Sequence, residues 1–151
     1  MTVDIKDIPS IEIVKLLPKS SCNCEECQDM CKRHRPCWGT PKEINTLIDM
    51  GYAKRLMEDY YEDGDVLVKG TVSIICPALK GSESSRAPWW PCGLCNFHNE
   101  GLCEIHKVRP IEAKIFDHTE NKDAHLYHLA IMKLWDTEEG RAVVKKWKDT
   151  I

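Results

Sequence analysis

The chain has 151 residues, 42% of them hydrophobic, which suffices for one packed domain and excludes disorder over its whole length. Lys and Arg number 21 against 24 Asp and Glu, and this near balance argues against a general nucleic-acid-binding protein, which carries a basic excess. The sequence has no apolar run of the roughly 18 residues that a membrane span needs, and no secretory leader. We therefore expect a cytoplasmic protein that does not contact membranes.

Two helices are expected in the first third of the chain. One is weakly amphipathic, covers residues 11–17 and stops at Pro18, which cannot continue a helix. Residues 40–43 (TPKE) predict the start of the other, because the threonine can cap it, the proline fits the first helical position and the glutamate completes a capping box. Gly51 is a natural end for this helix. Its expected buried face consists of Ile44, Leu47 and Ile48.

The middle of the chain is expected to combine a further helix with short β-hairpins. Apolar residues recur every three to four positions over residues 53–60, which predicts the helix. Residues 65–76 are rich in Val and Ile around a glycine, which predicts a hairpin. After a loop over residues 77–91, a second hairpin is expected to pair residues 95–97 with residues 102–105.

The end of the chain is expected to be helical. A short helical turn begins at Arg109-Pro110, a helix follows from Asp123, and Asp136 starts a last helix. The expected buried stripes of these two long helices are Leu126, Leu129, Ala130 and Leu134 in the first, and Val143, Val144 and Trp147 in the second.

The sequence thus predicts a small α+β fold with a loop-rich core of cysteines and metal, short β-hairpins, covering helices and a helical C-terminal tail. Three parts are expected along the chain. They are an N-terminal segment (1–21), a Cys-rich metal-binding domain (22–114) and C-terminal helices that pack on the same domain (115–151).

The nine cysteines are far more than an average composition gives, and most lie in polar stretches that cannot form an apolar core. An odd number in a chain expected in the reducing cytoplasm does not fit a closed disulfide framework. Cys-rich loops gain folding free energy when they bind a metal ion, so we interpret the cysteines as metal ligands. For Cys76, burial as a small apolar side chain is the alternative. The candidate ligands are Cys24, Cys27, Cys31, Cys37, Cys76, Cys92, Cys95 and Cys103.

Two C-x2-C pairs are central to this interpretation, Cys24-x2-Cys27 and Cys92-x2-Cys95. A turn of that length lets both thiolates reach one tetrahedral ion. Each pair has further cysteines within ten residues, which supplies additional ligands nearby. Two such pairs in one short chain therefore indicate metal sites.

Residues 24–31 (CEECQDMC), followed by the helix start described above, resemble the signature of the CxxCxxCC, or YkgJ-type, family of proposed zinc- or iron-chelating proteins. Residues 95–98 (CNFH) resemble its Cys-x-Phe-Leu element, and residues 101–110 (GLCEIHKVRP) its Gly-x-Cys-x-Ile-Tyr-x-x-Arg-Pro element. The match covers about residues 22–114, with the elements in the expected order. The resemblance implies metal chelation, and the ligands that it carries over are Cys24, Cys27, Cys31, Cys95 and Cys103.

The chain lacks two cysteines of the family pattern. Met30 stands in place of the third cysteine of the signature, and Ala113 in place of the cysteine expected three residues after Arg-Pro. The chain has additional cysteines elsewhere. We therefore hypothesise that Cys76 and Cys92 replace the missing ligands.

Histidines offer further nitrogen ligands. His98 and His106 stand where the family has Leu and Tyr, and each could supply an imidazole. His98 is expected in the exposed turn of the second hairpin. His106 would face away from Cys103 on a regular strand, and only a turn there would bring the two side chains together. His125 and His128 share one helix face, for which an ordinary amphipathic surface is the preferred interpretation.

Zinc is the preferred metal, because eight thiolates fill two closed tetrahedral sites. An iron–sulfur cluster also takes four thiolates and is the alternative, although residues 24–31 do not have ferredoxin spacing. The basic residues 32–35 (KRHR) lie beside the first cysteine cluster, where they would lower the pKa of the thiols. A nucleic-acid-binding patch is the less favoured interpretation of this basic run.

Three classes of function stay open. The first is a non-catalytic metal-binding protein whose thiolate sites hold the fold together. The second is an iron–sulfur protein with a redox or protein-modifying role, which the resemblance implies. An enzyme is not favoured, because the sequence lacks a nucleotide-binding loop, an HExxH motif and a nucleophile elbow. The third is a zinc-dependent interaction or regulatory module that docks a protein partner through Trp89 or Trp90.

Overall fold

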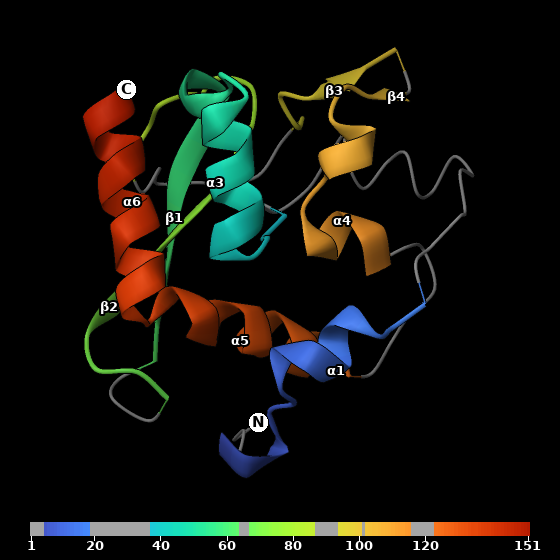
Figure 1. Ribbon diagram of the computed structural model, residues 1–151, viewed down its shortest axis with the longest axis vertical. Helices are drawn as coiled ribbons and strands as arrows, with labels where there is room; N and C mark the ends of the chain where they lie inside the picture. The colour runs from blue at the N-terminus through green and yellow to red at the C-terminus, as the bar shows by residue number, and fades with distance from the viewer. Residues whose placement is uncertain (1–4, 19–36, 64–66, 87–93, 101, 116–122) are drawn as a thin grey trace.

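The computed structural model describes residues 5–18, 37–63, 67–86, 94–100, 102–115 and 123–151 of the chain. Within these residues the helices are α1 (Ile11–Lys15), α3 (Pro41–Asp49), α4 (Ile111–Ile115), α5 (Ala124–Trp135) and α6 (Glu138–Thr150). The strands are β1 (Leu56–Glu62), β2 (Thr71–Pro77), β3 (His98–Asn99) and β4 (Leu102–Cys103), and they form two antiparallel two-stranded sheets. The predicted α+β fold is confirmed (Figure 1).

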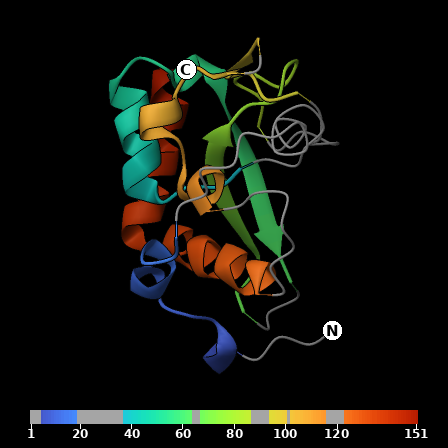
Figure 2. The same cartoon turned by 90° about the vertical axis from the view of Figure 1, so that its right-hand side faces the viewer.

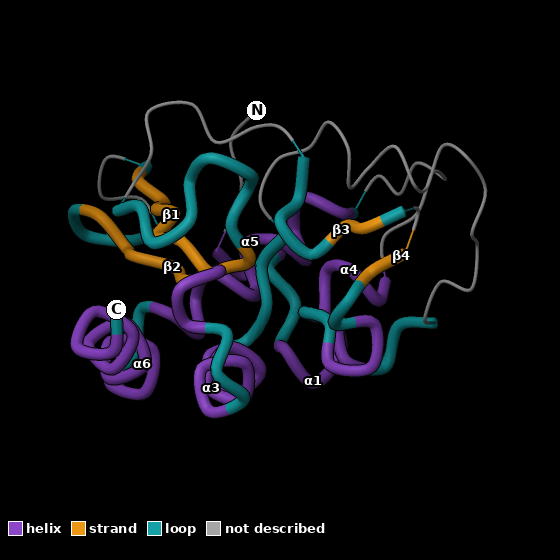
Figure 3. The backbone as a smooth tube through the Cα atoms, turned by 90° about the horizontal axis from the view of Figure 1, so that it is seen from above, coloured by secondary structure: helices purple, strands orange, loops and turns teal. Residues whose placement is uncertain are grey.

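The elements form two layers. The β1–β2 hairpin is one layer, and α3, α5 and α6 lie against it and each contact β2 (Figures 2 and 3). The β3–β4 hairpin and α4 lie beside α3, on the side away from α6 (Figures 1 and 3). None of the helices in the described ranges is both long and apolar enough to cross a lipid bilayer.

The β1–β2 hairpin corrects two predictions. The helix expected over residues 53–60 is wrong, because a 3₁₀ turn (Ala53–Arg55) leads directly into β1. The hairpin expected within residues 65–76 is also wrong, because β2 pairs with β1, in a register that runs from Leu56↔Pro77 to Glu62↔Thr71. The apolar spacing in β1 fits a helix as well as a strand. The strand forms because a distant segment supplies its pairing partners, which local spacing cannot reveal.

Helix α3 forms as predicted. The Thr40 hydroxyl accepts a hydrogen bond from the Glu43 backbone N–H at 3.2 Å, and the Glu43 carboxylate accepts one from the Thr40 N–H at 2.9 Å, which completes the capping box. The chain leaves the helix through Gly51, whose φ of +94° is readily adopted only by glycine. The predicted apolar face is buried: Ile44, Leu47 and Ile48.

Helices α5 and α6 form the predicted helical end, with two differences. The cap of α6 is Thr137 rather than Asp136, since the Thr137 hydroxyl accepts the Gly140 N–H at 3.1 Å. The buried face of α5 is wider than predicted and excludes Leu126 and Leu134, because α5 contacts α1, α6 and β2. Its buried residues are Leu129, Ala130, Ile131, Met132 and Trp135. Those of α6 include the predicted Val143, Val144 and Trp147.

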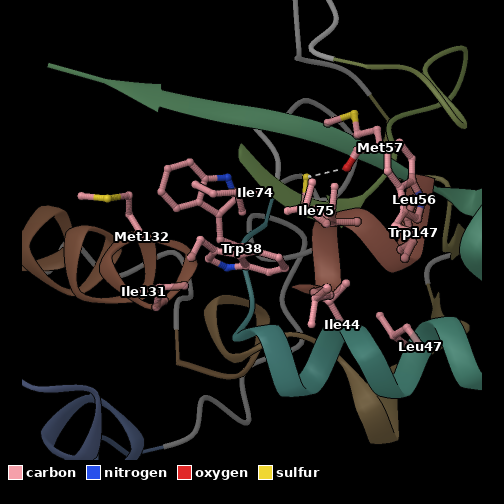
Figure 4. Close-up of a cluster of buried hydrophobic side chains, with 14 of the residues drawn as sticks. Trp38, Ile44, Leu47, Leu56, Met57, Ile74, Ile75, Ile131, Met132 and Trp147 are labelled. Atoms are coloured by element: carbon pink, nitrogen blue, oxygen red, sulfur yellow. Dashed lines mark hydrogen bonds between the residues drawn. The ribbon is translucent and has the colours of Figure 1, made fainter. Parts of the chain in front are cut away.

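One apolar core joins the two layers. Figure 4 shows Ile44 and Leu47 of α3 pointing towards Ile75 of β2 and Trp147 of α6. The two buried tryptophans of the last helices have hydrogen-bond acceptors for their indole N–H groups. Trp135 Nε1 donates to the Gly39 carbonyl at 2.9 Å, and Trp147 Nε1 to the Ala53 carbonyl at 2.8 Å. These bonds fix the C-terminal helices against segments near the start of the described core.

Candidate metal centre

The predicted ligands fall partly outside the described residues. Those that lie outside are Cys24, Cys27, Cys31 and Cys92, together with Cys22, Trp89, Trp90 and the basic run 32–35. Those that lie inside are Cys37, Cys76, Cys95 and Cys103, and none of these four is in a disulfide. The described residues by themselves bring no three His, Cys, Asp or Glu side chains together as a metal site. The four described thiols are therefore candidate parts of a site.

Cys76 lies on β2, opposite Met57 of β1, and its side chain is completely buried. The thiol donates to the Met57 carbonyl oxygen over a long distance of 4.0 Å (dashed line at Met57 in Figure 4). Burial raises the pKa of the Cys76 thiol well above its ordinary value. Two carboxylates, Asp59 and Glu112, raise this pKa further, and so does Cys95 when its own thiol is ionised. An isolated thiolate is disfavoured there, whereas the same negative groups would attract a cation.

Cys95 is joined to the segment that follows Cys76. Leu79, just beyond the end of β2, pairs with Cys95 in an antiparallel bridge. Backbone hydrogen bonds of 2.8 and 2.7 Å on either side extend this pairing. The extension of β2 thus brings two cysteines from separate segments close enough for the charge of Cys95 to act on the pKa of Cys76.

The second predicted hairpin is present, although its strands are shorter than expected and shifted. His98 on β3 pairs with Cys103 on β4. The His98 backbone N–H donates to the Cys95 carbonyl at 3.1 Å, which closes a turn over residues 95–98. Cys95 and Cys103 therefore lie at the two ends of one small hairpin.

Arg55 fixes this hairpin to the rest of the fold. Its guanidinium donates to the Asn96 side chain (Nε to Oδ1, 2.6 Å) and backbone oxygen (3.1 Å), and it forms an ion pair with Glu104. The same guanidinium lies over the buried Phe97 ring, 4.3 Å from its centroid, and Phe97 packs edge-on against Tyr52. Asn96 directly follows Cys95, and Glu104 directly follows Cys103. Arg55 therefore helps to position both thiols.

The groups around Cys103 shift the pKa of its thiol in opposite directions. Burial raises the pKa of the Cys103 thiol, and the nearby Glu104 carboxylate also raises it. The Ile105 N–H, which hydrogen-bonds the sulfur, and the positive charge of Arg109 lower it. Hydrogen bonds of this kind stabilise thiolates and orient ligands in metal sites. On balance the pKa of the Cys103 thiol is raised, because burial has the largest effect, so the surroundings favour the neutral thiol when no cation is bound.

Trp38, which follows Cys37, contacts several parts of the molecule. The Trp38 backbone N–H donates to Glu112 Oε1 at 2.6 Å, and its indole Nε1 donates to Asp59 Oδ2 at 2.8 Å. The Trp38 ring stacks on the imidazole of His128, with centroids 3.6 Å apart. Glu112, which is buried, also hydrogen-bonds His128 Nδ1. These contacts fix the backbone next to Cys37 at the edge of the core.

The histidines differ from the sequence predictions. His98 lies in β3 and is half-buried, so its expected place in an exposed turn is wrong. His106 is exposed and begins a 3₁₀ turn, and the regular strand assumed for it does not continue that far. His128 packs on Trp38 and binds Glu112, so the ordinary surface position expected for it is wrong.

Two residues that organise this region, Arg55 and Glu112, were not identified from the sequence. Arg55 falls in the stretch predicted as a helix, and its partners near Cys95 and Cys103 are far away along the chain. Glu112 is a single charged residue in a short helix, where exposure is the ordinary expectation. Neither residue type nor spacing distinguishes them, because their role depends on tertiary contacts.

Comparison of the chain with family models, with curated proteins and with solved structures finds no match. The resemblance to the CxxCxxCC family therefore rests on the motif residues themselves. Of those residues, Cys103 lies in the β3–β4 hairpin and Cys95 lies three residues before its first strand, and Arg55 contacts the residue after each.

Proposed function

We propose that this protein binds zinc through cysteine thiolates and that the bound ions attach its Cys-rich segments to the folded core. The observation that carries the proposal is the antiparallel bridge that joins Cys95, a member of a C-x2-C pair, to Leu79, three residues beyond Cys76 on the extension of β2. This pairing supports Cys76 as a replacement ligand. The proposed ligands are Cys24, Cys27, Cys31, Cys37, Cys76, Cys92, Cys95 and Cys103.

The rigid setting of the described cysteines supports the proposal. Cys37 is followed by the anchored Trp38, Cys95 lies in a bridge to Leu79, and Cys103 lies in β4. A ligand that the fold already holds in place loses little conformational entropy when it binds an ion. The local charge also favours a cation, because Asp59 and Glu112 both act on the Cys76 thiol.

Metal analysis of the protein purified without added metal tests the proposal. We expect a colourless protein with about two zinc ions per chain, since each closed site takes four ligands. A protein without bound metal would contradict the proposal. A brown protein that contains iron and sulfide would indicate an iron–sulfur cluster in place of zinc. A redox role would then be the leading function.

Single substitutions locate the ligands within the same experiment. Cys76→Ser and Cys92→Ser should each lower the zinc content, because each removes a proposed thiolate. Cys22→Ser is the matched control, since Cys22 is the one cysteine outside the proposed ligand set. Circular dichroism of each variant shows whether it folds. A Cys76→Ser/Cys92→Ser protein with its full zinc content would show that these cysteines do not replace the missing family ligands.

A further inference from the structure

His98 has a ring nitrogen that the described structure leaves without a partner. Its Nε2 atom is buried and makes no hydrogen bond, and it is the sole buried side-chain nitrogen or oxygen of this kind in the described ranges. Buried polar atoms in folded proteins are nearly always paired, because an unpaired one lowers stability. The Nε2 atom of a neutral imidazole is also a common metal ligand. A bound ion is therefore one partner that would satisfy it.

Two cysteines are neighbours of His98, one three residues earlier in the chain and one opposite it in the hairpin. Cys95-x2-His98 has the spacing of a C-x2-C pair, and the hydrogen bond from His98 N to Cys95 O closes the turn between them at 3.1 Å. His98 also pairs directly with Cys103 across the hairpin. Side chains of directly opposed residues in antiparallel strands project to the same face, with Cβ atoms about 4.5–5.5 Å apart. The hairpin thus offers two sulfurs and one nitrogen.

The backbone that carries these three groups is held in place, although the three described side chains do not by themselves converge as a metal site. Arg55 binds Asn96 and Glu104, the neighbours of the two cysteines. Binding of one ion by all three groups would therefore require rotation of their side chains on a backbone that is already held in place.

We infer that His98 binds, through Nε2, the same zinc ion as Cys95 and Cys103, so that this site combines imidazole and thiolate ligands. The inference rests on the proposed zinc-binding function and names a ligand which that proposal does not contain. Zinc accepts nitrogen and sulfur ligands together, and exchange of one thiolate for an imidazole changes the formal charge of a four-ligand site from about −2 to about −1. One of the eight proposed cysteines is then not needed as a ligand.

His98→Asn in the full chain tests the inference, with His106→Asn as the matched control. His106 is nearby along the chain but exposed on a 3₁₀ turn. Competition with a chromophoric chelator should show that His98→Asn binds zinc at least about tenfold more weakly, since loss of even an outer partner of a ligand costs that much. The visible spectrum of the cobalt-substituted protein should also shift in His98→Asn. His106→Asn should match the wild type in both measurements.

The possible outcomes separate this inference from the proposed function. If the wild type binds zinc and His98→Asn equals it in affinity and in cobalt spectrum, the inference is wrong and the proposed function stands. If the wild type binds no metal, both are wrong. If His98→Asn does not fold, NMR spectroscopy of the wild-type protein substituted with cadmium-113 tests the inference instead. Scalar coupling from the metal to the His98 ring protons supports the inference, and its absence overturns it.

Discussion

Glu112 is a buried carboxylate that binds two groups at once. It accepts the Trp38 backbone N–H at 2.6 Å and hydrogen-bonds His128 Nδ1, while its own backbone N–H donates to the Trp38 carbonyl at 3.2 Å. A carboxylate is tolerated inside a protein when its oxygens are paired in this way. Glu112 therefore connects α4, α5 and the segment that carries Cys37.

Replacement of this carboxylate should destabilise the fold. Glu112→Ala leaves the Trp38 N–H and the His128 ring nitrogen without their acceptor, which should lower the free energy of unfolding by at least about 2 kcal/mol. Urea denaturation measures this change. Glu12→Ala is the control, because Glu12 forms an exposed ion pair with Lys15 at 3.8 Å whose loss should cost less than about 1 kcal/mol. Equal losses in the two variants would argue against a structural role for the buried carboxylate.

At the scale of the elements, the first turn of helix α6 lies close against the end of helix α5. A Cβ atom at Gly140 would lie 2.5 Å from both the Cα and the carbonyl oxygen of Trp135, and 2.7 Å from the carbonyl oxygen of Leu134. All three atoms belong to the backbone, so no side-chain rotation can relieve the contact. The absence of a side chain at Gly140 therefore allows the tight connection between the two helices.

This close approach predicts a reversal of the usual effect of alanine in a helix. Gly→Ala inside a helix ordinarily stabilises it by about 0.5–1 kcal/mol. Gly140→Ala should instead lower the free energy of unfolding by about 1–3 kcal/mol, because the backbone must shift to make room. Thermal and urea unfolding measure the change, with Arg141→Ala, at the exposed next position, as a control expected within about 0.5 kcal/mol. A Gly140→Ala protein more stable than the wild type would contradict the prediction.

Elements specified by neighbouring residues could be predicted from the sequence, and those specified by distant partners could not. The start and end of α3 follow from Thr40, Glu43 and Gly51, which act within one or two helical turns. The state of residues 56–62 depends on pairing with residues 71–77, and the apolar spacing alone indicated a helix. The candidate site divides in the same way. Residue type and spacing identify its cysteines, whereas Arg55 acts through tertiary contacts.

At the scale of the whole molecule, the apolar core of the described residues contains little cysteine. The buried residues of α3, β1, β2, α5 and α6 form one cluster, and Cys76 is its one cysteine among the described residues. The other described cysteines are partly exposed, at the border of this core. Bound metal would therefore add order at the border, while burial of apolar surface stabilises the centre.

Removal of metal should accordingly unfold the protein only in part. With a strong chelator, we expect most of the helical circular dichroism to remain, because α3, α5 and α6 pack on β2 through apolar contacts. Hydrogen exchange should become faster at the β3–β4 hairpin, which carries Cys103 and borders Cys95. Loss of the whole helical signal on chelation would show that the core depends on the metal.

The hydrogen bond from Trp135 to the Gly39 carbonyl also has a consequence for the newly made chain, because it joins residues 96 positions apart. At 5–20 residues per second, synthesis takes about 5–20 s to pass from one to the other. Throughout that interval the cysteines of residues 22–37 have been made, but the helices that complete the core have not. The nascent chain therefore exposes these thiols to oxidants and competing ions before the apolar core can form.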